Sequence, residues 1–311
     1  MPVFKIHHVT RYEYDRLVKE SNNEIRVYPY QCAEQEILQH QLSISGQPPV
    51  HQFDDYWGNL TGTFNVMPPH KEMVIDSKVV VRTTQAATPQ INFDAGFSEL
   101  ESMLDGHLSL LELSRPDFIR SQSQIQEMVA IFLDRNKTVA HMVEEAGRYV
   151  YTHFKYLKGI TTIETTVDQL LVHQAGVCQD FAHVLLQLLR TMGVPSRYVS
   201  GYICPNKNGM RGEGATHAWV EAYIPGSGWA GLDPTNNVWV SNTHVKLAVG
   251  RNFNDCSPVK GNFRGPARQK LSVYVSVSYE DGHTFEDRND VKQETADSSS
   301  ETFDAAHMPQ Q

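Results

Sequence analysis

Alternation of apolar and polar residues dominates the first part of the chain. Residues 3–14, 37–44 and 73–82 alternate, and the shorter apolar runs between them stop at proline, glycine or asparagine. An alternation with a period of two residues is typical of strands that bury one face. Proline, glycine and asparagine are typical of the turns between such strands. Residues 1–95 are therefore predicted to form an antiparallel β-sandwich domain.

A helical period replaces the alternation further along. Residues 96–122 are rich in turn signals and are predicted to be a connector with one short helix near 99–104. Apolar residues then fall on one helical face at 125–133, 139–150 and 181–192. Thr166 and Gln169 have the spacing of a capping box, which predicts the start of another short helix.

Strand patterns return after the last helix. Residues 197–203, 217–224, 229–233 and 271–279 read as β. Helices followed by antiparallel strands are typical of an α+β domain, which we expect to span residues 123–282. Residues 283–311 are rich in Asp, Glu, Ser and Gln and are predicted to be a disordered tail.

Composition narrows the class of protein. The 311 residues carry a formal net charge of −9, which argues against a nucleic-acid partner because such a partner needs a basic face. We expect neither a signal peptide nor a membrane span, and hence a cytoplasmic protein. The four cysteines are far apart, with no Cys-x-x-Cys pair, so we expect no disulfide and no structural zinc, and nothing indicates a cofactor.

Three residues have the order and placement of a catalytic triad. Cys178 precedes a strong helix, His217 opens a strand, and Asp233 closes the next strand. A thiol attacks a carbonyl as the thiolate, which a helix N-terminus and a neighbouring imidazole both favour. A carboxylate holds that imidazole in the useful tautomer and stabilises its charged form. Each residue alone is more often structural, but the combination favours a thiol nucleophile.

The triad requires one particular strand register. For Asp233 to orient His217, both side chains must lie on the same face of the sheet. Pairing Ile224 with Gly228 across a three-residue loop places Asp233 diagonal to His217, whereas pairing Ile224 with Trp229 places it on the opposite face. We therefore predict a three-residue, glycine-containing loop over 225–227, or an equivalent bulge.

Several motifs resemble the bacterial transglutaminase-like superfamily, whose members are often labelled cysteine proteases. They are Gly-Val-Cys-Gln-Asp-Phe-Ala at 176–182, Gly-Val-Pro-Ser-Arg-Tyr at 193–198, His-Ala-Trp-Val-Glu at 217–221 and Leu-Asp-Pro-Thr-Asn at 232–236. Asp-Tyr-Trp-Gly-Asn at 55–59 resembles the β-rich domain that often precedes this core.

The resemblance implies a papain-like core. Cys178 would be the nucleophile, His217 the acid and base, and Asp233 the orienting group. Members often have an aromatic donor to the oxyanion upstream of the cysteine, and Tyr156 matches it, although a packed aromatic is the alternative reading. Asp180 and Arg197 also match the family and are interpreted as structural.

The triad sets the first half-reaction but not the acceptor. We expect a peptide or protein amide substrate that is hydrolysed, as in a cysteine protease or amidase. Transfer to an amine, as in a transglutaminase, is the alternative, and a non-catalytic binding module on the same fold is an alternative of another class. A metalloenzyme is a weaker rival, because the many histidines lack the HExxH spacing.

Overall fold

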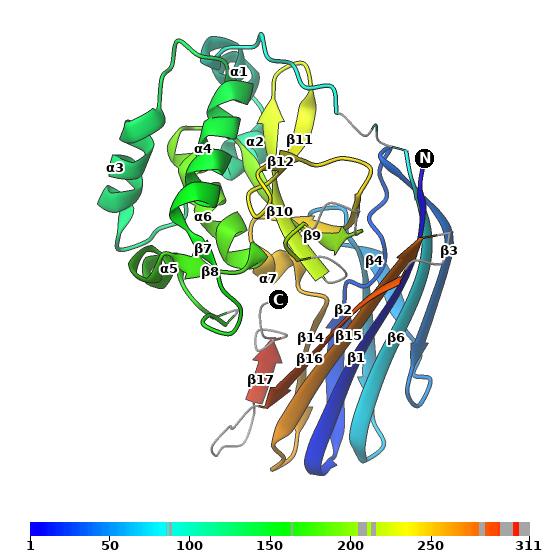
Figure 1. Ribbon diagram of the computed structural model, residues 1–311. Coiled ribbons are helices and arrows are strands. Elements are labelled where there is room, and N and C mark those ends of the chain that lie inside the picture. The colour runs from blue at the N-terminus through cyan, green and yellow to red at the C-terminus, as the bar shows by residue number, and fades with distance from the viewer. Residues whose placement is uncertain are drawn as a thin grey trace.

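A computed structural model describes residues 1–84, 86, 89–162, 164–204, 210–212, 216–279, 284–292 and 301–304. Two face-to-face antiparallel sheets form a β-sandwich, and a third sheet with helices on one side forms a separate core (Figure 1). The fold is thus mixed α and β with an N-terminal β domain, as the sequence predicted.

The sandwich is built from both ends of the chain. Along one sheet the order is β16 (Thr284–Lys292), β15 (Gln269–Tyr279), β1 (Val3–Val18), β6 (His70–Thr83) and β3 (Gln35–Ile44). Along the other it is β17 (Glu301–Asp304), β14 (Val259–Arg264), β2 (Glu20–Ile25), β5 (Leu60–Val66) and β4 (His51–Asp54). Phe4, Ile6 and Tyr12 of β1 are buried between the sheets, in keeping with the alternation in the sequence.

Two assignments from the sequence were wrong. The strand at 271–279 was placed in the catalytic core, but β15 pairs with β1 from Tyr14↔Gln269 to Phe4↔Tyr279. Alternation identifies such a strand without saying which sheet it joins. Within the region expected to be a disordered tail, β16 and β17 are strands whose backbones pair with β15 and β14, and residues 283, 293–300 and 305–311 lie outside the described residues.

The core sheet has the order β12 (Val238–Trp239), β11 (Gly228–Asp233), β10 (Thr216–Ile224), β9 (Ser196–Ile203) and β13 (His244–Gly250). A short parallel pair, β7 (Lys155–Tyr156) and β8 (Ala175–Gly176), lies beside it. Alternate residues of β10 such as Val220 and Ile224 pack against the helices. Trp219, on the other face, belongs to a buried cluster against which Tyr30 and Trp57 of the sandwich domain pack, so both faces of the sheet are covered.

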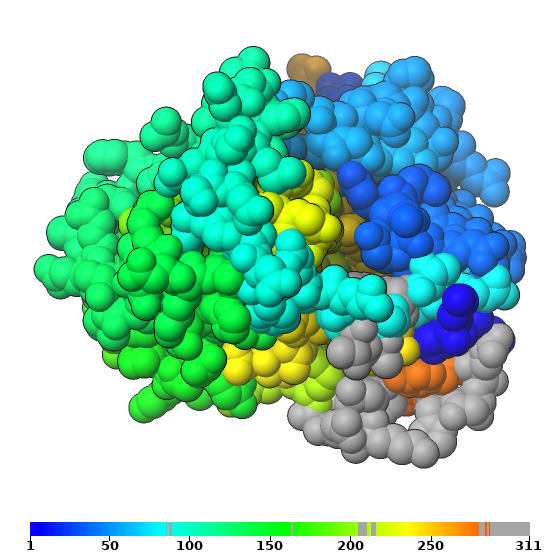
Figure 2. All heavy atoms as spheres, turned by 90° about the horizontal axis from the view of Figure 1, so that it is seen from above, coloured from blue at the N-terminus to red at the C-terminus, as the bar shows by residue number. Residues whose placement is uncertain are grey.

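Seven helices are described. They are α1 (Phe97–Leu104), α2 (Leu108–Leu113), α3 (Gln122–Phe132), α4 (Val139–His153), α5 (Val167–His173), α6 (Cys178–Thr191) and α7 (Phe253–Cys256). The connector therefore contains α2 as well as the expected helix, and Figure 2 shows the chain that leaves the sandwich, in cyan, running across to the helical core, in green. Nearly every side chain of α6 is buried, because α3, α4 and α5 surround it on the sheet. None of the helices in the described ranges combines the length and apolar character needed to cross a membrane.

The sandwich domain holds the core by satisfying its edge strand. β13 ends the core sheet, and an edge strand leaves unpaired N–H and C=O groups. The Gln35 amide binds Lys246 N and O, each at 2.8 Å, and the Asn59 amide binds Val249 N and O, also at 2.8 Å. Two amide side chains thus take the place of a neighbouring strand, which fixes the two units to each other.

This edge contact generates a stability prediction. The variant Asn59→Ala leaves two buried backbone groups of Val249 without partners, which costs about 1–3 kcal/mol for each group. We expect the free energy of unfolding in urea to fall by roughly 2–6 kcal/mol. The matched change Asn65→Ala, at an exposed site on β5, should alter it by less than about 0.5 kcal/mol. Equal effects of the two substitutions would contradict this account.

Candidate active site

Cys178 is the first residue of α6, and its buried position follows from the residues around it. The Asp180 carboxylate accepts hydrogen bonds from Val177 N at 2.8 Å and from Thr161 Oγ1 at 2.7 Å. A side chain at Gly176 would place its Cβ 2.2 Å from Asp180 Oδ2, so this position requires glycine. The Gly-Val-Cys-Gln-Asp motif therefore anchors the start of the helix, whose positive end lies at the Cys178 thiol.

The predicted register is confirmed. Ile224 pairs with Gly228 and Val220 with Leu232, so the register places Asp233 opposite Trp219 and diagonal to His217. Ser227 N closes the three-residue loop by donating to Ile224 O at 3.0 Å. Asn92, which lies between β6 and α1, holds this loop, because its N–H donates to Ser227 Oγ at 2.7 Å and its amide donates to Pro225 O at 2.9 Å.

His217 and Asp233 meet in the interior. Nε2 of His217 lies 2.9 Å from Oδ2 of Asp233, and both side chains are fully buried. Burial alone lowers the pKa of His217, but the Asp233 carboxylate and the Cys178 sulfur outweigh it and raise that pKa to about 10. Because Nε2 is engaged by Asp233, Nδ1 is the nitrogen left for the thiol. The structure thus brings together the three residues that the sequence singled out.

The Asp233 carboxylate stays ionised because it is surrounded by donors. Burial alone raises its pKa, but the His217 charge and hydrogen bonds hold the pKa of Asp233 well below its ordinary value. Oδ2 also accepts from Asn236 Nδ2 at 2.7 Å, and Oδ1 accepts from Thr235 N at 2.9 Å. A second imidazole, that of buried His244, has its Nε2 3.5 Å from Oδ2.

Two of these neighbours of Asp233 were not found from the sequence. Asn236 belongs to the Leu-Asp-Pro-Thr-Asn motif. Its amide side chain, three residues after Asp233, could have identified it as a donor to that carboxylate. His244 had no such signal, because it reaches Asp233 only through the pairing of β13 with β9. Asp180 and Arg197 are structural here: Asp180 caps the start of α6, and Arg197 Nη2 pairs with Glu221 at 2.6 Å.

Tyr156 lies near the thiol through backbone pairing. It is the partner of Gly176 in the β7–β8 pair, two residues before Cys178. Its hydroxyl lies 3.9 Å from where a Cβ of Gly212 would be, and the same Cβ would lie 2.8 Å from His217 Nδ1. Its role as a donor to the oxyanion stays a prediction.

Metal-ligand spacing occurs at the same place. Among the residues that the structure describes, His217, Asp233 and His244 offer three ligand atoms within 4.8 Å of one another. The His217 and Asp233 atoms already share a hydrogen bond, so a metal ion would have to break the triad contact. The geometry is that of a triad with an additional histidine.

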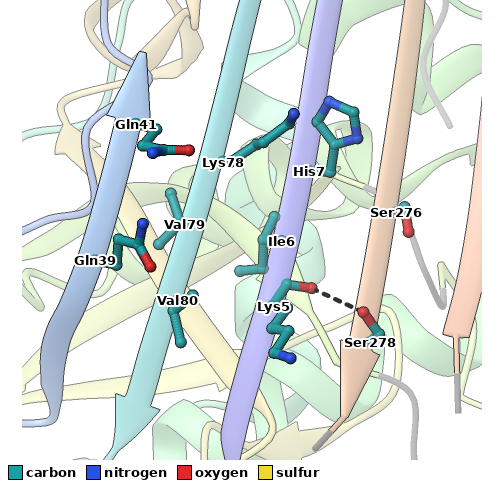
Figure 3. A pocket seen from close by; sticks show the side chains of 10 residues that line it. All are labelled: Lys5, Ile6, His7, Gln39, Gln41, Lys78, Val79, Val80, Ser276 and Ser278. Atoms are coloured by element: carbon teal, nitrogen blue, oxygen red, sulfur yellow. Dashed lines mark hydrogen bonds between the residues drawn. The ribbon is translucent and has the colours of Figure 1, made fainter. Parts of the chain in front are cut away.

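A separate hollow lies on the outer face of the first sandwich sheet. It has a volume of about 350 Å³, contains none of the triad residues, and is drawn in Figure 3. Its lining residues come from β1, β3, β6 and β15 and are mostly lysine, glutamine and serine. We assign it no chemistry.

The pair of His217 and Asp233 predicts how Cys178 reacts. In Asp233→Asn the carboxylate charge is lost, so the imidazolium is no longer favoured and the thiolate loses its counter-ion. We expect alkylation of Cys178 by iodoacetamide at about pH 6 to slow by roughly tenfold or more, as followed by intact mass. Asp54→Asn, an exposed change of equal charge on β4, should have no effect. Unchanged alkylation in Asp233→Asn would refute the ion pair.

The pKa of His217 also predicts how stability depends on pH. A histidine with a pKa of 6.5 when unfolded and about 10 when folded gives its full stabilisation below about pH 6.5 and loses it as the pH rises through about 10. Between these values the wild-type unfolding free energy should fall by up to about 1.4 kcal/mol per pH unit relative to His217→Asn. Chemical denaturation at several pH values measures both slopes, and parallel slopes would show that the shift is absent.

Comparison with known proteins identifies the family of the chain. The chain matches the bacterial transglutaminase-like N-terminal region over residues 4–82 and the transglutaminase-like superfamily over residues 128–234. It is 30% identical over 279 residues to an uncharacterized protein of Mycobacterium leprae, with 88% of this chain and 98% of that protein covered.

Two further matches differ in extent. The chain is 35% identical over 98 residues to a protein-glutamine gamma-glutamyltransferase of Pseudomonas aeruginosa. These residues make up 29% of this chain and 15% of that protein. A crystal structure from Cytophaga hutchinsonii, named "Putative Cysteine Protease", matches with a TM-score of 0.67 and 20% identity over 99% of this chain and 96% of that one. The chain belongs to the transglutaminase-like superfamily and carries the bacterial N-terminal region of that superfamily ahead of its core.

Proposed function

We propose that this protein is a thiol-dependent acyl-transfer enzyme that hydrolyses a peptide or isopeptide-like amide. The observation that carries the proposal is the burial of His217 between Asp233 and Cys178, with the thiol at the start of α6. Burial of an ion pair is expensive unless each charge has partners, and this arrangement supplies a partner for each. Such a pair is what a nucleophilic thiol requires at neutral pH.

The first half-reaction follows from these positions. The Cys178 thiolate attacks the carbonyl carbon, and the carbonyl π electrons move to oxygen. His217 gives its Nδ1 proton to the leaving amine as the C–N bond breaks, which leaves an acyl-thioester and a neutral imidazole. The oxyanion would be stabilised by the N–H of Cys178 and by the Tyr156 hydroxyl, the latter on the family resemblance.

The second half-reaction restores the enzyme. His217 takes a proton from water, the hydroxide adds to the thioester, and the C–S bond breaks to release a carboxylic acid and the thiolate. Water needs no binding site of its own, so hydrolysis makes the least demand on the protein. Asp233 keeps Nδ1 directed at the reacting atoms throughout, because it holds Nε2.

Transfer to an amine is the second candidate. It is favoured by the partial match to a protein named as a protein-glutamine gamma-glutamyltransferase. In that reaction an amine nitrogen replaces water as the acceptor, and the residues of the first half-reaction are the same.

We also place the reaction in the cytoplasm. All four cysteines are free, including the buried Cys204 and Cys256, which suits a reducing compartment. A peptide or protein amide remains the proposed substrate.

An acylation experiment tests the proposal. With p-nitrophenyl acetate we expect a burst of nitrophenol equal to the enzyme concentration, and one acetyl group on Cys178 by peptide mapping. Cys178→Ala and His217→Ala should abolish the burst, whereas Cys32→Ala, a change of the same residue type at the sandwich domain, should keep it. Decay of the acyl-enzyme in the presence of an added amine then separates hydrolysis from transfer. The absence of any Cys178 adduct in the folded wild type would point to a non-catalytic binding module.

A further inference from the structure

Arg211 is a charged residue beside the triad that the chemistry above does not use. Its guanidinium lies over the Tyr151 ring, with Cζ 4.7 Å from the ring centroid. Among the described residues its side chain makes no hydrogen bond and no ion pair, and its Nη1 is buried without a partner. A guanidinium is always charged, and a buried donor without a partner costs free energy, so an oxygen acceptor brought there would be bound favourably.

The backbone of Arg211 is tied directly to the triad. Arg211 N donates to Asn236 Oδ1 at 2.7 Å, and Asn236 Nδ2 donates to Arg211 O at 3.2 Å. The same Nδ2 donates to Asp233 Oδ2 at 2.7 Å. One amide side chain therefore fixes the position of Arg211 relative to the catalytic carboxylate.

The residue after Arg211 lies against the reacting atoms. Gly212 has a φ of +80° and no room for a side chain, since a Cβ would lie 2.8 Å from His217 Nδ1. This is the imidazole nitrogen that faces the thiol. The backbone that carries Arg211 therefore borders the imidazole of the triad.

The geometry of the guanidinium selects the kind of group. The Tyr151 ring covers one face of the guanidinium, so a second group would bind through the N–H groups at its edge. A carboxylate fits such an edge through two parallel N–H···O bonds. The net charge of −9 would not attract an anion from a distance, so any preference for one has to come from a local contact.

We propose that Arg211 binds a carboxylate of the acyl donor, so that the enzyme acts on amides carrying an acidic group close to the scissile bond. An acidic side chain or a terminal carboxylate of a peptide has this chemistry. The inference rests on the proposed function, since it names the substrate class of the same site.

A pair of matched alkylating probes tests the inference without a known substrate. N-bromoacetyl-β-alanine carries a carboxylate, and its β-alaninamide analogue carries a neutral amide of the same size. Both react when the Cys178 thiolate displaces bromide. We expect the carboxylate probe to label wild-type Cys178 about tenfold faster, as one charge-assisted hydrogen bond would give.

Variants assign the preference to Arg211. In Arg211→Gln the two rates should become equal, mainly through slower labelling by the carboxylate probe, and Arg211→Lys should keep part of the preference. Arg16→Gln makes the same change in net charge at an exposed site on β1 and should leave the wild-type ratio unchanged.

The outcomes separate this inference from the proposed function. If wild type and Arg211→Gln label rapidly with the same ratio, Arg211 does not bind the carboxylate, while the reactive thiol stands. A uniform slowing of both probes in Arg211→Gln would also overturn the inference, because Arg211 would then act on the thiol rather than on the anion. If Cys178 reacts with neither probe faster than glutathione does, the proposed function itself fails.

Discussion

The buried Asp233 carboxylate is the constraint on which the site depends. A carboxylate can remain charged in the interior only if donors surround it. Here those donors come from two places, His217 on the neighbouring strand and Thr235 and Asn236 in the following turn, while the His244 imidazole of the edge strand lies 3.5 Å away. Each of these donors is oriented by the charge that it stabilises. The position of the His217 imidazole is therefore a consequence of keeping one ion in the interior.

The same charge connects the site to the segment at Arg211 and Gly212. Asn236 donates to Asp233 and to the Arg211 carbonyl with one nitrogen, and it accepts from Arg211 with its oxygen. The segment at Arg211 and Gly212 thereby becomes part of the rigid surroundings of the triad. A specificity residue held in this way needs no large structural change on binding, which favours preorganised recognition.

Local patterns predicted the triad and its register because both depend on neighbours in the sequence. The glycine-containing loop at 225–227 sets the pairing of β10 with β11, and that pairing alone brings Asp233 to His217. The assignment of β15 could not be predicted in this way, since its alternation suits any half-buried strand. β13 was missed altogether because it is buried on both faces and has no alternation. His244 lies on that strand, so its place beside Asp233 depends on a long-range pairing.

The order in which the strands enter the sandwich affects how the protein is made. β1 and β2 near the start of the chain find partners in β15 and β14, which are synthesised after the whole core. On a ribosome, both sandwich sheets therefore remain incomplete while residues between β6 and β14 emerge. The apolar face of β1 and its open edge are exposed during that interval, which is the situation in which nascent chains aggregate or engage chaperones. The core can make its amide contacts at β13 once the early strands are folded, because Gln35 and Asn59 belong to that early part of the chain. Synthesis thus favours a folding order in which the early half of the sandwich first supports the core. The late strands then complete both sandwich sheets.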